Sequence, residues 1–182
     1  MIFYKRVAKI AYKINGYKKV GDYMVKILKI SDYLKENQQE FIKLISEVYI
    51  FSGELQKDYP SRLQWYWQKV VPDIFRSVRE IFIATNYNEI IGIAILKKEN
   101  KEKKICTLLV DENYRRQGIA NQLLRESFLY LGTSTPLISI PKHKVNQFSG
   151  IIKKYGWKET QVLEKGYYSN FSKEIVFNGK IK

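Results

Sequence analysis

Residues 108–120 read LLVDENYRRQGIA, and this stretch decides how the rest of the sequence is interpreted. An apolar run gives way to a polar turn, and a helical pattern begins near Gly118. The first N–H groups of a helix have no partner within it, so such a junction can bind an anion. Gly118 and Ala120 have almost no side chain, which lets a phosphate approach the backbone closely. With Arg115 and Arg116 nearby, the junction predicts a phosphate-binding loop.

Taken alone, a helix start with one glycine and two arginines also occurs where no ligand binds. Two better-known phosphate motifs are excluded, because the sequence contains neither GxxxxGK[ST] nor GxGxxG. The interpretation of this loop therefore depends on the elements around it.

The residues before the loop predict an antiparallel meander. Three runs rich in apolar and β-branched residues predict its strands: residues 81–85, 90–96 and 105–110. The turn residues 86–88 connect the first two runs, and a charged loop over 97–103 connects the second pair.

Ahead of the meander, the pattern predicts one strand and two helices. Residues 23–30 read as the strand, and a helix follows to about residue 49, capped by Ser31 or Asp32. A second helix is expected over residues 61–71, ending before Pro72.

Behind the loop, the pattern continues with helices and short strands. It predicts a helix over 117–131, a strand over 137–140, a helix over 145–155, and a closing β-pair from 157–164 and 173–177. The chain is long enough for one domain with a hydrophobic core.

The N-terminal residues are expected to form a basic helical extension over residues 1–22, ahead of a domain over 23–182. Apolar residues over 3–14 recur at helical spacing, with lysines and an arginine on the other face. Residues 1–30 hold eight Lys/Arg and one acid, which is half of the net charge of +14. Such a helix binds anionic membranes or phosphates, or simply packs its apolar stripe on the domain.

Composition excludes several classes of site. Cys106 is the only cysteine and His143 the only histidine, which excludes internal disulfides and zinc sites built from several such ligands. No metal is therefore expected. No apolar run approaches the ~20 residues of a membrane helix, and no secretory signal is recognisable, so we expect a cytoplasmic protein without a transmembrane segment.

The loop and its surroundings resemble the GNAT superfamily of N-acetyltransferases. RRQGIA at 115–120 matches the family motif Q/R-x-x-G-x-G/A, and residues 110–115 resemble the family's approach V-x-x-x-Y-R. Gly156-Trp157 looks like the Gly-aromatic pair that ends the late helix of the family. The element order over 23–182 resembles the GNAT fold, an α/β (α+β) fold with a mixed, mostly antiparallel central sheet flanked by helices.

This resemblance implies an acetyl-CoA site built mostly from backbone. Its pyrophosphate is expected on the amides of the loop: Arg115, Arg116, Gln117, Gly118, Ile119 and Ala120. The pantetheine arm is expected to pair with the central strand at Leu108, Leu109 and Val110. Asn146 matches an asparagine near the pantetheine, and residues 137–140 would splay away from the central strand to open the gap.

The reaction implied is direct acetyl transfer to an amine, which needs a base, an oxyanion donor and an acid for the thiolate. The tyrosine that many family members use as the acid is replaced by Ile152. Ser139, His143 and Tyr155 are the remaining candidates, and each also reads as a strand, loop or packing residue. Deprotonation through water is a further alternative.

The function expected from the sequence is acetyl-CoA-dependent N-acetylation of an amine on a small molecule, a protein or an aminoacyl-tRNA. The positive charge favours an acidic partner over a polycationic one. The alternatives are an acyl-CoA-binding sensor with little turnover, and an adaptor that binds nucleic acid or membrane through the N-terminal helix. A homodimer is a candidate assembly.

Overall fold

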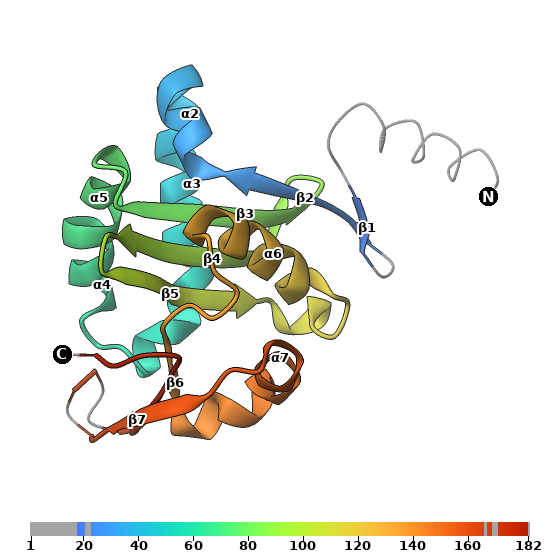
Figure 1. Ribbon diagram of the computed structural model, residues 1–182. Coiled ribbons are helices and arrows are strands. Elements are labelled where there is room, and N and C mark those ends of the chain that lie inside the picture. Colours follow the sequence, from blue (N-terminus) through green and yellow to red (C-terminus); the bar gives the residue numbers. More distant parts are fainter. Residues whose placement is uncertain (1–17, 21–22, 166, 169–170, 182) are drawn as a thin grey trace.

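The computed structural model describes residues 18–20, 23–165, 167–168 and 171–181 (Figure 1). The predicted basic helix over residues 3–14 lies outside these residues. The division between extension and domain at residue 22 therefore stays a prediction. No helix among the described residues is long and apolar enough to cross a membrane.

A five-stranded antiparallel sheet forms the centre of the fold. Its order along the sheet follows the chain: β1 (Lys18–Val20), β2 (Tyr23–Lys29), β3 (Arg79–Asn86), β4 (Glu89–Glu99) and β5 (Glu102–Val110). The predicted first strand and the meander are confirmed. Residues 18–20, which the prediction placed in the N-terminal extension, form β1 and pair with β2.

The predicted charged loop over 97–103 is wrong, because β4 and β5 continue through it and leave only a tight turn. Lys97 Nζ lies 2.7 Å from carboxylate oxygens of both Glu99 and Glu102. The pair with Glu102 joins opposite charges across the hairpin, and the pair with Glu99 lies within β4, so a charged segment can remain extended here.

Helices cover both faces of this sheet (Figure 1). One face is covered by a layer that we call the α2–α5 layer: α2 (Ile30–Glu36), α3 (Gln38–Phe51), a 3₁₀ segment η1 (Ser52–Lys57), α4 (Arg62–Trp65), a π-helical segment η2 (Tyr66–Val70) and α5 (Val71–Phe75). The other face is covered by α6 (Ile119–Leu131). Strand alternation sends Ile81, Ile83, Ile93 and Ile95 toward the α2–α5 layer.

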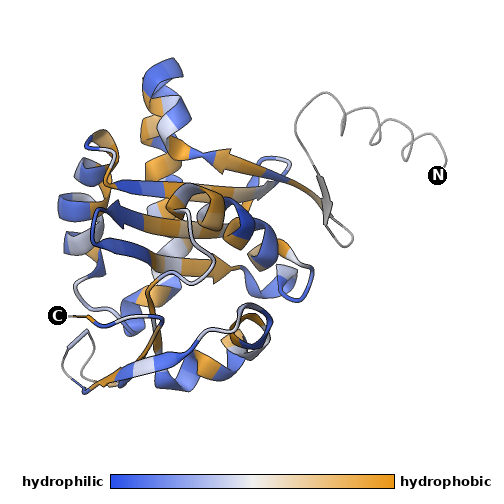
Figure 2. Cartoon of the chain, in the orientation of Figure 1, coloured by the Kyte–Doolittle hydropathy of each residue, from blue (hydrophilic) through white to orange (hydrophobic). Residues whose placement is uncertain are grey.

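Figure 2 shows the apolar residues gathered in the middle strands of the central sheet. Phe82, Ala94 and Leu96 of these strands face α6 and pack on its buried Leu123 and Leu124. The core therefore has two parts, one on each face of the sheet, and the part on the α6 side fixes α6 relative to β4 and β5.

The predicted helix over 31–49 is broken in two, and its predicted caps are wrong. The first helix begins at Ile30, and Ser31 donates from its N–H and Oγ to the buried Glu80 carboxylate at 3.2 and 2.7 Å. Asn37 separates α2 from α3, and its side chain accepts from the N–H of Glu40 at 3.1 Å. The Glu80 carboxylate, which comes from the distant strand β3, therefore caps α2 in place of a local side chain.

The predicted end before Pro72 is also wrong, because the helical path continues to Phe75. Pro72 lies in the first turn of α5, where proline has no N–H bond to lose. The π-helical segment η2 directly precedes this turn.

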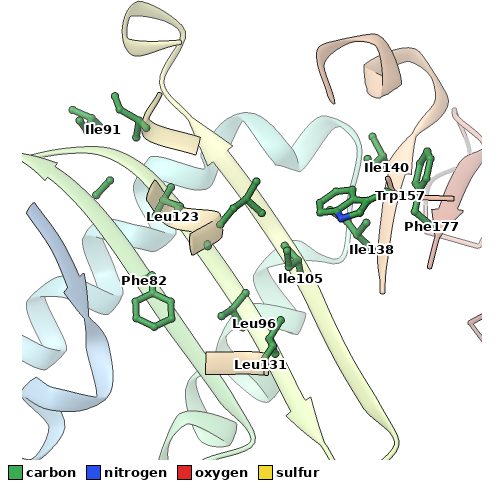
Figure 3. Close-up of a cluster of buried hydrophobic side chains, with 14 of the residues drawn as sticks. Phe82, Ile91, Leu96, Ile105, Leu123, Leu131, Ile138, Ile140, Trp157 and Phe177 are labelled. Carbon is green, nitrogen blue, oxygen red and sulfur yellow. The ribbon is translucent and has the colours of Figure 1, made fainter. Parts of the chain in front are cut away.

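A second, three-stranded sheet follows α6, in the order β6 (Ile138–Pro141), β8 (Glu174–Phe177), β7 (Glu159–Leu163). The predicted strand over 137–140 and the closing β-pair are confirmed. Between β6 and β7 lie a 3₁₀ segment, η4 (Lys142–Phe148), and α7 (Ser149–Tyr155), so the predicted helix over 145–155 is only partly α-helical. Figure 3 shows Trp157 packed with Ile138, Ile140 and Phe177 of this sheet.

Among the described residues, backbone hydrogen bonds join the two sheets near the start of β5. Ile105 N–H donates to Leu137 O, and Leu137 N–H donates to Lys103 O, both at 2.9 Å. Beyond this bridge, β5 and β6 belong to different sheets. A register shift leaves Cys106 as an extra residue in β5 at the same place, and a bulge of this kind bends a strand.

Gly92 on β4 sets how closely α6 approaches the sheet. A Cβ at this position would lie 3.1 Å from both Leu109 O and Leu123 Cδ1. We therefore expect Gly92→Ala to lower the free energy of unfolding by about 1–3 kcal/mol in urea denaturation, because the core must shift to admit a methyl group. Gly53→Ala is the control, since nothing lies within 4 Å of that Cβ. Equal stability of the two variants would contradict this contact.

Candidate functional site

The loop between β5 and α6 is held in a tight, partly left-handed conformation. A short 3₁₀ segment, η3 (Glu112–Tyr114), follows β5. Arg116 then has φ 61° and Gly118 has φ 84°, both in the left-handed region that favours glycine. Two residues with positive φ within three positions turn the chain from β5 into α6.

Local bonds stabilise this turn. Asp111 accepts from the N–H of Asn113 at 2.9 Å, and Tyr114 OH donates to Glu89 at 2.7 Å. The Arg115 guanidinium donates from Nε to the Val110 carbonyl at 3.0 Å, and its other end lies 3.9 Å from Glu54. Arg115 therefore supports the loop, a role that its sequence position does not reveal.

The loop presents a row of backbone donors. The N–H groups of residues 116–121 have no hydrogen-bond acceptor among the described residues, and the first bond of α6 runs from Gln122 N–H to Gly118 O at 3.2 Å. These donors lie at the positive end of a 13-residue helix. The predicted residues Gln117, Gly118 and Ala120 are half-buried and Ile119 is buried, so this surface is mainly backbone. It suits a phosphate group in charge and in shape.

The neighbouring edge of β5 carries further backbone groups. Asp111 N–H donates to a β4 carbonyl, at 3.0 Å, so its backbone faces β4. Since backbone groups alternate along an antiparallel strand, Leu109 also faces β4, whereas Leu108 and Val110 face the opposite edge. The Val110 carbonyl accepts from Arg115 there, which agrees with this orientation. No described strand pairs with this part of the edge.

A cavity of about 510 Å³ lies between α6 and α7. Asn121, Arg125, Lys154 and Tyr155 contribute polar groups to its lining. Asn121 Oδ1 accepts from Lys154 Nζ at 2.8 Å and from Tyr155 OH at 3.3 Å. The structure thus places Tyr155 on the α6 side of the fold, where its ring also packs against Phe128.

On the opposite face lies Glu174, a buried acid that the sequence analysis missed, beside two half-buried residues with hydroxyl groups, Tyr59 and the predicted candidate Ser139. We call these three residues the Glu174 cluster. Glu174, at the start of β8, is only 1% exposed. Tyr59 OH donates to its Oε1 at 3.2 Å, and Ser139 lies on β6, the strand that pairs with β8. Ser139 lies between two residues of the α6-side core, so alternation turns its side chain toward the α2–α5 side.

Burial perturbs both acidic groups of this cluster. It raises the pKa of the Glu174 carboxyl to about 7, and the nearby Asp58 adds to this effect. The hydroxyls of Tyr59 and Ser139, together with the Lys104 charge, act in the opposite direction. Burial and the Glu174 carboxyl raise the pKa of Tyr59, so its phenol stays protonated and donates. A carboxyl with a pKa near neutrality is suited to accepting a proton.

A charged rim surrounds the Glu174 cluster. Asp58 lies 2.6 Å from Lys144 Nζ and 3.2 Å from His143 Nε2. His143 also contacts Ser172 Oγ at 3.2 Å, and 52% of its side chain is exposed. The structure brings Ser139 and His143 to the same region, and of these two residues Ser139 is the one that lowers the pKa of Glu174.

The remaining predicted residue, Asn146, is exposed in η4. Cys106 lies 3.1 Å from Arg79 Nη1, in the core facing the α2–α5 layer. Among the described residues, no three His, Cys, Asp or Glu side chains are grouped in a way that could hold a metal ion.

The sequence indicates the burial of Glu174 only weakly. It starts the run EIVF at 174–177, in which every residue is buried. A glutamate at the beginning of such a short apolar strand usually lies in solvent, so only the pairing of β8 with β6 and β7 reveals its burial.

Comparison with known proteins identifies the domain in the middle of the chain. Residues 77–159 match the family model described as an acetyltransferase (GNAT) domain. No curated protein sequence matches the chain.

Solved structures share the fold at low sequence identity. The ribosomal-protein-S18-alanine N-acetyltransferase from Escherichia coli has a TM-score of 0.58 and 15% identity, with 85% of this chain and 92% of that chain covered. An IAA acetyltransferase from Bacillus cereus has a TM-score of 0.56 and 16% identity, covering 84% and 97%. A GNAT-family protein from Desulfovibrio desulfuricans has a TM-score of 0.58 and 13% identity, covering 84% and 96%. These similarities confirm the predicted fold class.

Proposed function

Because residues 77–159 match the model of a GNAT acetyltransferase domain, we propose that the chain transfers the acetyl group of acetyl-CoA directly to the nitrogen of an amine. The observation that carries this proposal is the row of backbone donors over residues 116–121 at the start of α6. A pyrophosphate has the charge and the acceptor oxygens to satisfy several of these donors at once. The exposed Arg116 adds positive charge at the same place.

The free edge of β5 supports binding of the pantetheine arm. Pantetheine contains two amide groups, and it can pair with the backbone of Leu108 and Val110 as an extra strand would. The backbone of Leu109 faces β4, so this residue is proposed to support the pantetheine only by holding its two neighbours in the strand. The sheets part beyond the bridge at Leu137, so the thioester would lie in the gap between β5 and β6. Asn146 is proposed to lie near the pantetheine.

In this arrangement the protein mainly positions and polarises the reactants. A backbone N–H on the free edge of β5 is placed to donate to the oxyanion of the tetrahedral intermediate. The acceptor amine is proposed to approach from the α2–α5 side, where the loop that holds Tyr59 forms a wall. The net charge of +14 favours an acceptor with acidic surroundings, on a small molecule, a protein or an aminoacyl-tRNA.

A thermal-shift measurement tests the cofactor proposal. Acetyl-CoA at 100 times its Kd is expected to stabilise the protein by about 2.7 kcal/mol, since it binds only the folded chain. NAD⁺ is the comparison ligand, because it has a pyrophosphate but no pantetheine, and we expect it to shift the melting temperature much less. No shift with acetyl-CoA, CoA or longer acyl-CoAs would overturn the proposal. A shift without release of CoA thiol in the presence of any primary amine would instead indicate an acyl-CoA sensor.

A further inference from the structure

The Glu174 cluster lies where β5 and β6 part. Tyr168, in the segment between β7 and β8, connects the two sides: Lys104 Nζ on β5 donates to its hydroxyl at 3.2 Å. The rings of Tyr168 and Tyr59 meet edge to face with centroids 6.1 Å apart. Ser139 lies on β6, which pairs with the strand that carries Glu174. The cluster therefore spans the start of the β5–β6 gap on the face opposite α6.

Glu174 is a buried acid whose contacts are with hydroxyl groups. Among the described residues, no cation lies within 4.0 Å of its carboxylate. Lys144 and His143 are paired with Asp58, and Lys104 donates to Tyr168. Burying a carboxylate without a cationic partner is unfavourable, so an ammonium group bound beside Glu174 would stabilise its charged form.

On the basis of the proposed function, we propose that Glu174 binds the ammonium group of a primary-amine acceptor at the mouth of the β5–β6 gap and takes its proton. The products of this step are a neutral amine and a protonated Glu174. The nitrogen lone pair then forms a bond to the thioester carbon, and the carbonyl π electrons move to oxygen. Collapse breaks the C–S bond, the thiolate leaves with the electron pair, and the second N–H proton neutralises it. Glu174 afterwards releases its proton to water.

The candidates predicted from the sequence fit this step less well. His143 is largely exposed and its imidazole is already engaged by Asp58 and Ser172. Tyr155 lies on the α6 side, bonded to Asn121. Ser139 acts through Glu174, as a hydroxyl donor that positions the carboxylate.

All groups that face Glu174 affect its titration in a known direction. Tyr59, Ser139 and Lys104 favour the carboxylate, and Asp58 opposes it. We therefore expect Tyr59→Phe to raise the Glu174 pKa, because it removes a donor to the charged form. Asp58→Asn is expected to lower it, because it removes a neighbouring negative charge.

The experiment measures CoA thiol release from acetyl-CoA by the full chain, with alaninamide, Nα-acetyllysinamide and ethanolamine as acceptors, between pH 5.5 and 9. With the fastest of these amines, Glu174→Gln is expected to lower kcat at pH 7.5 by about 100-fold. The acid limb of the wild-type profile should move to higher pH in Tyr59→Phe and to lower pH in Asp58→Asn. Glu159→Gln, an exposed acid on the neighbouring strand β7, is the matched control and should retain the wild-type rate. An unchanged rate and acid limb in Glu174→Gln would overturn the proposal.

A second measurement does not depend on turnover or on the choice of acceptor. The ¹³C resonance of the Glu174 carboxyl is identified as the one missing from Glu174→Gln, and its pKa is followed by NMR. Methylammonium chloride is expected to lower that pKa by about one relative to the same concentration of sodium chloride. No difference between the two salts would overturn the ammonium site.

Acetyl-CoA binding separates this inference from the function on which it rests. Both wild type and Glu174→Gln should show the thermal shift with acetyl-CoA. Loss of the shift in both proteins would overturn the proposed function. A normal shift with no effect of Glu174→Gln on rate or pH profile would overturn only the role of Glu174.

Discussion

Acetyl-CoA is expected to raise the melting temperature of the wild-type protein and to leave that of Gly118→Glu unchanged. Gly118 has φ 84°, where any side chain adds steric strain, and it precedes the first residue of α6. A glutamate there also places a carboxylate at the N–H groups that we assign to the pyrophosphate. The carboxylate competes with the ligand for donors and repels it, so we expect at least a 100-fold loss of affinity, equivalent to about 2.7 kcal/mol.

Gly132→Glu is a close control for this variant. Gly132 ends the same helix with φ 70°, so both substitutions introduce the same charge into the same kind of backbone. The two positions lie roughly 20 Å apart, because α6 rises about 1.5 Å per residue. Both variants should melt below the wild type, but only Gly132→Glu should retain the shift with acetyl-CoA. Loss of the shift in both would mean that α6, and not the loop, had been damaged.

The loop and the central meander could be predicted because their signals are local. Each strand of the meander is a continuous apolar run, and Gly118 marks the start of α6 by its own backbone preference. The donors of residues 116–121 follow from the helix start, with no need for side-chain contacts. A binding site built from backbone N–H groups can be predicted from the sequence wherever the start of the helix is recognised.

The errors arose where a distant residue replaced the local partner. Ser31 was predicted to cap the helix with its side chain, but its N–H and its hydroxyl both donate to the buried Glu80 carboxylate of β3. The charges at Lys97 and Glu102 looked like a loop, but they pair across the hairpin. Neither interaction can be predicted from a short stretch of sequence, because each depends on the register of the strands in the sheet.

The candidate for acid–base chemistry was missed for the same reason. Glu174 and Tyr59 are separated by 115 positions, and their contact exists only because β8 enters the second sheet beside β6. Sequence analysis instead named Ser139, His143 and Tyr155, whose side-chain chemistry is visible without a structure. The fold places His143 on an exposed rim, Tyr155 against α6, and Ser139 on the strand that pairs with β8.

Glu174→Gln is expected to make the protein more stable than the wild type above pH 7. The folded chain holds the Glu174 pKa near 7, above the ordinary value of 4.5. Between these two values the folded state binds more protons than the unfolded state, so wild-type stability falls as pH rises through this window. The full loss is about 3 kcal/mol, at 1.36 kcal/mol for each unit of pKa. Glutamine cannot ionise and avoids this loss.

The measurement is the melting temperature of both proteins between pH 4.5 and 8.5 without ligand. Near pH 4.5 the two should differ little, and above pH 7 the variant should melt roughly 6–12 °C higher, since 1 kcal/mol corresponds to about 2–4 °C in a domain of this size. Glu159→Gln should follow the wild type throughout, because its carboxylate is exposed on β7. A constant difference between Glu174→Gln and wild type across this range would contradict a raised Glu174 pKa. A rising difference, together with lost turnover, would show that the buried carboxylate is kept for its chemistry at the expense of stability.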